Sequence, residues 1–62
     1  MTNKEFAQRY LNCFQKEVEV ILNSGEKITG IFFDEDEDDS SIYVGNYNIY
    51  IKDIKEMKLR AK

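Results

Sequence analysis

The sequence predicts a mainly β protein in which one N-terminal helix precedes a strongly bent antiparallel barrel of five short strands. Three observations support this prediction. Apolar residues follow a helical period up to about residue 14, the period changes to two from Glu17 onward, and turn residues separate the apolar stretches that follow. The 62 residues contain no proline and no linker-like stretch, so we expect one domain over residues 1–62.

The N-terminal helix is predicted over about residues 2–14. Thr2 and Glu5 have the spacing of a capping box, in which each side chain accepts a hydrogen bond from a backbone N–H that the first helical turn leaves unpaired. One stripe of apolar side chains at helical spacing should pack on the strands, or should bind a partner in the alternative interpretation: Phe6, Tyr10, Cys13 and Phe14.

The first two strands are predicted at about 17–22 and 27–33. Val18, Val20 and Leu22 alternate along the first of them, and Asn23-Ser24-Gly25 supplies a turn in which glycine can take a positive φ. The second strand carries apolar residues on both faces around Gly30. We therefore expect it to bend at Gly30 and to be shared between two halves of the barrel, with Ile28 and Phe32 on one face and Thr29, Ile31 and Phe33 on the other.

The remaining strands are predicted at about 41–44, 47–51 and 55–60. Gly45 and Asn46 form a two-residue loop suited to a type I′ or II′ hairpin turn. Residues 52–54 should make a short 3₁₀ turn. In the last strand Met57 and Leu59 are expected to point inward.

The segment Val18–Phe33 (VEVILNSGEKITGIFF) and the closing segment IYIKDIKEMKL resemble the Sm-like superfamily of the LSm and Hfq type. Members of this superfamily have an SH3-like barrel after an N-terminal helix, so the resemblance implies that fold. The positions that match its hydrophobic and glycine spacing are Val18, Val20, Leu22, Gly25, Ile28 and Gly30.

The RNA pocket of this superfamily does not carry over to the chain. RNA-binding members have an Asp followed four residues later by an Asn, whereas Asp34 is followed by Asp38. The second motif offers Arg-Gly or Lys-His, whereas residues 51–54 read IKDI. In acidic character, and in the GEK after its first strand, the chain is similar to the acidic Sm-like inhibitors of the transcription terminator Rho. That similarity implies a function exerted by binding a protein.

Composition argues against several function classes. The net charge of −3 disfavours nucleic acid, since phosphate backbones attract a positive field. There is no histidine, and the single Cys13 is expected on the buried face without a base, so we expect no enzyme, no catalytic residue, no cofactor and no zinc site. No apolar run is long enough to span a membrane and no signal peptide is recognised. We expect a cytoplasmic protein with a reduced thiol.

The acidic run after the second strand is the main candidate site. We expect an exposed loop that binds a protein partner, with homo-oligomer formation as a further option, and its residues are Asp34, Glu35, Asp36, Glu37, Asp38 and Asp39. As a calcium loop it fails, because Asp39 stands where glycine is required and Gly45 where a bidentate Glu is required. Only weak association with divalent cations remains as an alternative of this kind.

Binding of RNA or single-stranded nucleic acid is the other alternative. Exposed aromatic side chains can stack on bases when basic side chains lie near them. The candidate residues are Tyr43, Tyr47, Tyr50, Lys52, Lys55, Lys58 and Arg60, with Lys62 beyond them.

Overall fold

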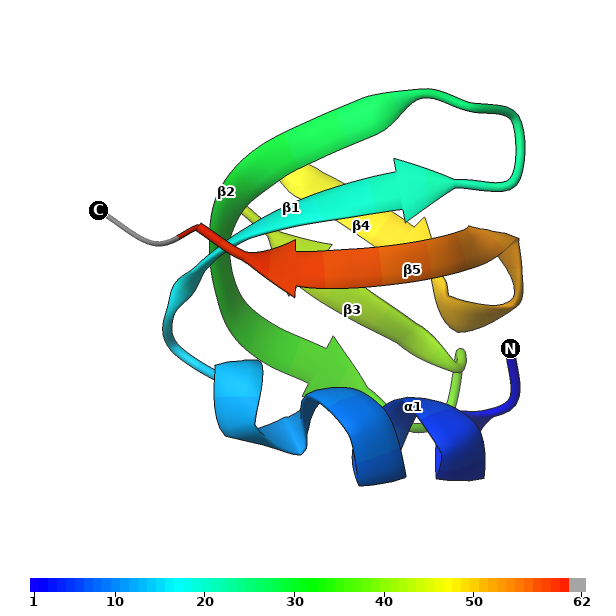
Figure 1. Cartoon of the computed structure of the whole chain (residues 1–62). Helices are drawn as coiled ribbons and strands as arrows, with labels where there is room; N and C mark the ends of the chain where they lie inside the picture. Colours follow the sequence, from blue (N-terminus) through cyan, green and yellow to red (C-terminus); the bar gives the residue numbers. More distant parts are fainter. Residues whose placement is uncertain (61–62) are drawn as a thin grey trace.

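The protein is described by a computed structural model over residues 1–60 (Figure 1). Its elements in chain order are the helix α1 (Asn3–Tyr10), the 3₁₀ turn η1 (Leu11–Cys13), β1 (Glu17–Leu22), β2 (Lys27–Asp36), β3 (Ser41–Val44), β4 (Tyr47–Tyr50), the 3₁₀ turn η2 (Ile51–Asp53) and β5 (Ile54–Leu59). A mainly β chain with an N-terminal helix and five antiparallel strands is therefore confirmed.

The five strands form one curved sheet in the order β4-β3-β2-β1-β5. The first part of β2 pairs with β1 and its second part pairs with β3, so β2 belongs to both halves of the sheet. Within residues 1–60 no ladder joins the two edge strands, β4 and β5. The sheet is strongly bent but not closed, and the predicted barrel is not confirmed.

β2 changes its partner strand between Ile31 and Phe32, close to the bend predicted at Gly30. Gly30 pairs with Val18 of β1, and Phe32, only two residues later, already pairs with Val44 of β3. The backbone of Gly45, in the β3–β4 turn, packs directly on Gly30, where an added Cβ would lie 3.0 Å from the Gly45 nitrogen. The Gly45 N–H also donates to the carbonyl oxygen of Ile31 at 3.0 Å. A side chain at residue 30 would therefore push the two halves of the sheet apart.

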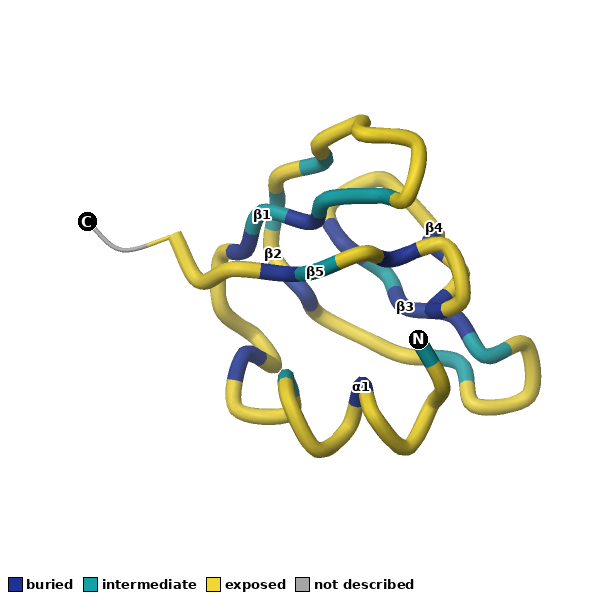
Figure 2. The backbone as a smooth tube through the Cα atoms, turned by 45° about the vertical axis from the view of Figure 1, so that its right-hand side comes forward, coloured by how far each residue is buried: buried dark blue, intermediate teal, exposed yellow. Residues whose placement is uncertain are grey.

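The core lies inside the curve of the sheet, and α1 covers one end of it (Figures 1 and 2). The Phe6 ring meets the Phe32 ring edge-on at 5.6 Å between centroids. The other buried apolar residues come from η1, η2 and the strands β1, β3, β4 and β5: Cys13, Val18, Val20, Ile42, Val44, Ile49, Ile51, Ile54 and Met57. Among the described residues no helix has the length and the apolar content needed to cross a membrane.

The helix is shorter than predicted, because α1 ends at Tyr10 and only a 3₁₀ turn follows. That turn buries Cys13 and brings Gln15 and Lys16 against β2, where the Gln15 N–H donates to the Phe32 carbonyl oxygen at 2.6 Å and the Phe32 N–H donates to the Lys16 carbonyl oxygen at 3.1 Å. Phe14 is partly exposed, although one edge of its ring contacts Phe32. A helix continued to residue 14 would forgo these backbone hydrogen bonds.

The bounds of two strands and one inward position also need correction. β4 ends at Tyr50, because Ile51 begins η2, and β5 spans Ile54–Leu59 rather than 55–60. Met57 is buried as predicted, but Leu59, near the end of the strand, is 45% exposed. Ile54 fills the core position that opens the strand.

Candidate functional site

The acidic segment, Asp34–Asp39, is only partly a loop. Its first three residues extend β2, with Asp34, Glu35 and Asp36 opposite Tyr43, Ile42 and Ser41 of β3. The prediction of a six-residue loop was wrong here. Cross-strand pairing with β3 gives these backbone groups hydrogen-bond partners, and this outweighs the low strand propensity of Asp and Glu.

Strand alternation divides the acidic segment between two faces of the molecule. Asp34 stands opposite Tyr43, and Asp36 is on the same side of the strand by alternation. Asp34 is exposed, whereas Asp36, opposite the buried Ser41, is half-buried. Glu35 stands opposite the buried Ile42 and belongs to the inner face, next to α1. Carboxylates are therefore presented on both sides of the hairpin.

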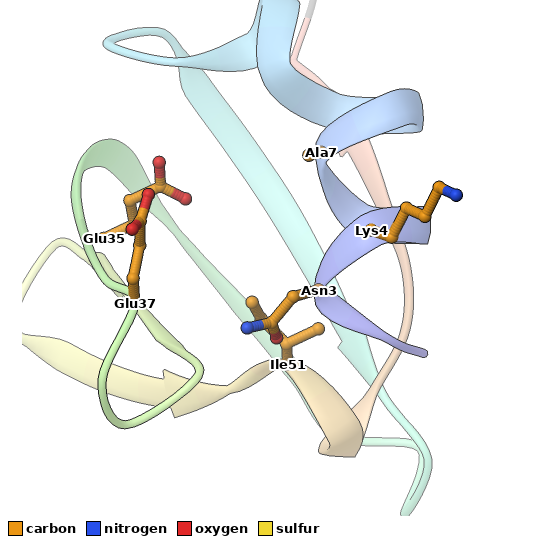
Figure 3. Close-up of a pocket in the computed structure, with 6 residues that line it drawn as sticks. All are labelled: Asn3, Lys4, Ala7, Glu35, Glu37 and Ile51. Carbon is orange, nitrogen blue, oxygen red and sulfur yellow. The ribbon is translucent and has the colours of Figure 1, made fainter.

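A hollow of about 430 Å³ lies between α1 and the end of β2, lined by Asn3, Lys4, Ala7, Glu35, Glu37 and Ile51. In Figure 3, Glu35 and Glu37 lie together on one side of the hollow, and the Lys4 side chain extends away from them. The Asn3 side-chain amide donates to Ser40 Oγ at 3.0 Å and so ties the helix to the hairpin turn.

The turn of the hairpin is ordered by its own carboxylates. Asp36 Oδ1 accepts from the N–H of Asp38 at 3.1 Å and from the N–H of Asp39 at 3.3 Å. Asp34 Oδ1 accepts from the N–H of Glu35 at 2.9 Å. Ser40 then takes a left-handed φ of 55° and leads the chain into β3. The acidic side chains are thus presented from a backbone of defined shape.

Among the described residues, no basic side chain forms an ion pair with the acidic segment. Within residues 1–60 the one ion pair joins Arg60 Nε to Glu17 Oε2 at 3.6 Å, on β5 and β1. The same part of the chain holds no group of three or more Cys, Asp or Glu residues arranged to hold a metal ion. The carboxylates are therefore available to a cationic group from outside the chain.

The residues of the nucleic-acid alternative are distributed over β3, β4, η2 and β5. Tyr47 and Tyr50 are about half exposed, and Lys52 Nζ lies 5.7 Å from the centre of the Tyr50 ring. Lys58 and Arg60 are on β5, at the other end of the strand order from β4, and Lys58 stands opposite Glu19 of β1.

The other candidates of this group lie on β5, on β3 or outside the described residues. Lys55 is exposed on β5, Tyr43 packs against Phe33 with 6.0 Å between ring centroids, and Lys62 lies outside the described residues.

Two apolar residues that were expected to share one face of the second strand are exposed. Ile31 is 52% exposed and Phe33 is 48% exposed, on the outer side of the bend in β2. Their alternation with the buried Phe32 places them on the opposite face of β2, because a strand in a small open sheet buries one face only.

Comparison with known proteins gives a fold relationship but no family. No family model matches the sequence, and no curated protein matches it. A chain from a solved structure described as "Structural basis of the Dcp1:Dcp2 mRNA decapping complex activation by Edc3 and Scd6" is similar, with a TM-score of 0.70 and 26% sequence identity. The match covers 86% of this chain and 60% of that one.

Proposed function

We propose that the chain is a non-enzymatic protein-interaction module of the Sm-like class, and that its acidic segment binds a basic surface on a partner protein. The observation that carries this proposal is the acidic hairpin itself. Six carboxylates project from an ordered hairpin, and none of them is in the ion pair found within residues 1–60. Charge of one sign on a surface speeds encounter with a partner of opposite charge and selects against others.

The Sm-like assignment is supported by the order of elements. An N-terminal helix precedes five antiparallel strands, the second strand is shared between both halves of the sheet, and glycine stands at its bend. The similar solved chain belongs to a structure concerned with the activation of one protein complex by further proteins. That context also favours an interaction role.

A non-catalytic role is supported by the chemistry of the side chains. Cys13 is buried and its Sγ lies 3.8 Å from Asn12 Oδ1, which is not a base that could remove the thiol proton. The sequence has no histidine.

The experiment compares two triple variants with the same change in net charge. Asp34→Asn/Asp36→Asn/Asp38→Asn removes three charges from the acidic segment and keeps the side-chain carbonyl oxygens that can accept hydrogen bonds. Glu19→Gln/Glu26→Gln/Glu56→Gln removes three charges elsewhere. Proteins retained by each immobilised variant are identified and quantified by mass spectrometry.

The Asn variant should retain at least tenfold less of its basic partners than the native chain does. The Gln variant should retain the same amount as the native chain. Equal retention by both variants would contradict the proposal. Sedimentation equilibrium of the native chain separates a module that binds another protein from one that associates with itself.

Nucleic-acid binding remains a second candidate, which the exposure of Tyr47 and Tyr50 and the position of Lys52 over Tyr50 favour. It predicts salt-dependent binding of mixed single-stranded RNA. Tyr50→Ala should weaken that binding, and the absence of NMR shift changes with RNA at low salt would eliminate this candidate.

A further inference from the structure

An apolar patch lies on the outer side of the bend in β2. Ile31 and Phe33 lie two residues apart on one face of the strand and are each about half exposed. Phe33 is at an irregularity in the ladder between Phe32 and Asp34, and its ring contacts the Tyr43 ring of β3. We call Ile31, Phe33 and Tyr43 the outer patch. Large apolar side chains grouped on a surface in this way are typical of contact sites for other molecules.

The charges beside the outer patch differ between its two ends. At the β1 end, Ile31 stands opposite Glu17, whose carboxylate is paired with Arg60. At the β3 end, Tyr43 stands opposite Asp34, and Asp36 follows on the same face. No basic side chain within residues 1–60 pairs with these two aspartates. The patch therefore borders a neutralised pair on one side and an uncompensated anionic strip on the other.

This asymmetry identifies the chemistry of the occupant. An apolar group alone would leave Asp34 and Asp36 without cationic partners, and an anionic occupant such as RNA or an anionic membrane would be repelled by them. A segment that carries an apolar side chain and two cationic side chains satisfies both features. Because Asp34 and Asp36 are alternate residues of a strand, their side chains lie roughly 6–7 Å apart, which is also the spacing of alternate residues in an extended peptide.

We propose that the outer patch binds an extended basic segment of a partner protein with the pattern apolar-x-basic-x-basic. The apolar side chain packs on Phe33 and Tyr43, and the two Lys or Arg side chains lie against Asp34 and Asp36. This inference rests on the proposed function and specifies its partner. The aromatic pair supplies the desolvated contact that carries most of the affinity, and the aspartates set the direction of the segment.

The test uses a defined probe, the acetylated and amidated peptide Leu-Ser-Arg-Ser-Arg, titrated into the ¹⁵N-labelled chain at low salt. Backbone amide shifts should concentrate at Ile31, Phe33, Asp34 and Tyr43. Two control peptides replace either the Leu or both Arg residues with Ser. Each control should bind about tenfold more weakly, which corresponds to about 1.4 kcal/mol.

Two variants make the test specific to the outer patch. Phe33→Thr removes the ring from a half-exposed strand position and should weaken binding of the Leu-containing peptide about tenfold. The affinity for the control peptide in which Ser replaces Leu should be unchanged. Ile31→Thr serves the same purpose should Phe33→Thr fail to give a folded amide spectrum. A coupling of this kind between the Leu of the peptide and a patch residue would not arise from charge attraction alone.

The possible outcomes separate this inference from the proposed function. If Phe33→Thr binds the peptide as the native chain does, or if the shifts are confined to residues 37–39, the outer patch is not the site, although the acidic segment can still bind partners. If the peptide does not bind while the Asn variant still loses its basic partners, the patch inference fails alone. If the two triple variants retain partners equally, the proposed function fails, whatever the peptide does.

Discussion

At the scale of single residues, the close approach of Gly30 and Gly45 determines how sharply the sheet can bend. The three glycines of the chain are required for different reasons. Gly25 has φ +96°, and a Cβ added there would have nothing within 4 Å. Gly30 has no unusual φ, but a Cβ added there would meet the Gly45 backbone. Backbone atoms cannot rotate away as a flexible side chain can, so Gly30 is required for packing and Gly25 for conformation.

We therefore predict that Gly30→Ala destabilises the protein by about 1–3 kcal/mol, the usual cost of forcing extra atoms into a packed site. Gly25→Ala should cost about 1–2 kcal/mol through its left-handed backbone. Urea unfolding followed by circular dichroism measures both values, with the exposed Lys27→Ala as the control. The amide resonances of Gly45 and Ile31 should shift in Gly30→Ala only. If Gly30→Ala is as stable as the native chain, β2 and the β3–β4 turn are not in tight contact at Gly30 and Gly45.

Asp36 illustrates how a carboxylate in the acidic segment can also have a structural role. Its Oδ1 accepts two backbone hydrogen bonds within the turn, and replacement of such an acceptor usually costs about 1 kcal/mol. We predict that Asp36→Ala is destabilising by about that amount, whereas Asp36→Asn, which keeps a carbonyl oxygen, is nearly neutral. Thermal unfolding measures both, and Asp38→Ala is the matched control. Equal stabilities of the Ala and Asn variants would argue against the turn geometry.

At the scale of elements, α1 begins with the capping box that the sequence predicted. Thr2 Oγ1 accepts from the Glu5 N–H, and Glu5 Oε1 accepts from the Thr2 N–H, both at 3.1 Å. Both hydrogen bonds hold the pKa of Glu5 below its ordinary value of 4.5. The bond with the Thr2 backbone has the larger effect, and the bond with the Thr2 side chain comes second.

A lowered pKa in the folded state means that Glu5 stabilises the fold at neutral pH. This contribution is complete above the pKa of the unfolded chain and is lost as the pH falls through the lower folded pKa. We predict that the native chain loses more stability between about pH 5 and pH 3 than Glu5→Gln does. Thr2→Val should cost about 1 kcal/mol and raise the pKa of Glu5. Carboxyl ¹³C NMR titration measures the pKa of Glu5. If the stabilities of the native chain and of Glu5→Gln depend on pH in the same way, the prediction is contradicted.

The elements that local chemistry determines were predictable from the sequence. The capping box, the left-handed Gly25, the Gly45 turn and the exact extents of β1 and β3 all depend on residues near one another in the chain. Gly45 has φ +57° and Asn46 has no positive φ, which is the II′ rather than the I′ pattern.

The features that depend on distant residues were not predictable. β2 continues into Asp34–Asp36 because β3 pairs with it, and α1 stops at Tyr10 because Gln15 and Lys16 pair with β2. The exposure of Ile31 and Phe33 follows from an open sheet, in which only the face toward the core is covered. The outer patch could not be identified until the curvature of the sheet was known.

At the scale of the whole molecule, charge is unevenly distributed. Half of the twelve acidic residues lie in the acidic segment, where alternate carboxylates are roughly 6–7 Å apart and no ion pair within residues 1–60 includes them. Repulsion at this distance is screened little at 0.01 M salt, where the Debye length is about 30 Å, and strongly at 1 M, where it is about 3 Å. The free chain therefore carries a repulsive strain in this hairpin that salt or a cationic partner relieves.

We predict that raising NaCl from about 0.01 M to about 1 M increases the free energy of unfolding by on the order of 1 kcal/mol. The Asp34→Asn/Asp36→Asn/Asp38→Asn variant should respond less, and the Glu19→Gln/Glu26→Gln/Glu56→Gln variant should respond like the native chain. Urea titrations at the two salt concentrations measure this difference. The same salt should weaken binding of the basic peptide, because it screens the attraction to Asp34 and Asp36 as well as the repulsion between them. Stability and affinity must then change in opposite directions with salt, and a parallel change in both would mean that the acidic segment governs neither.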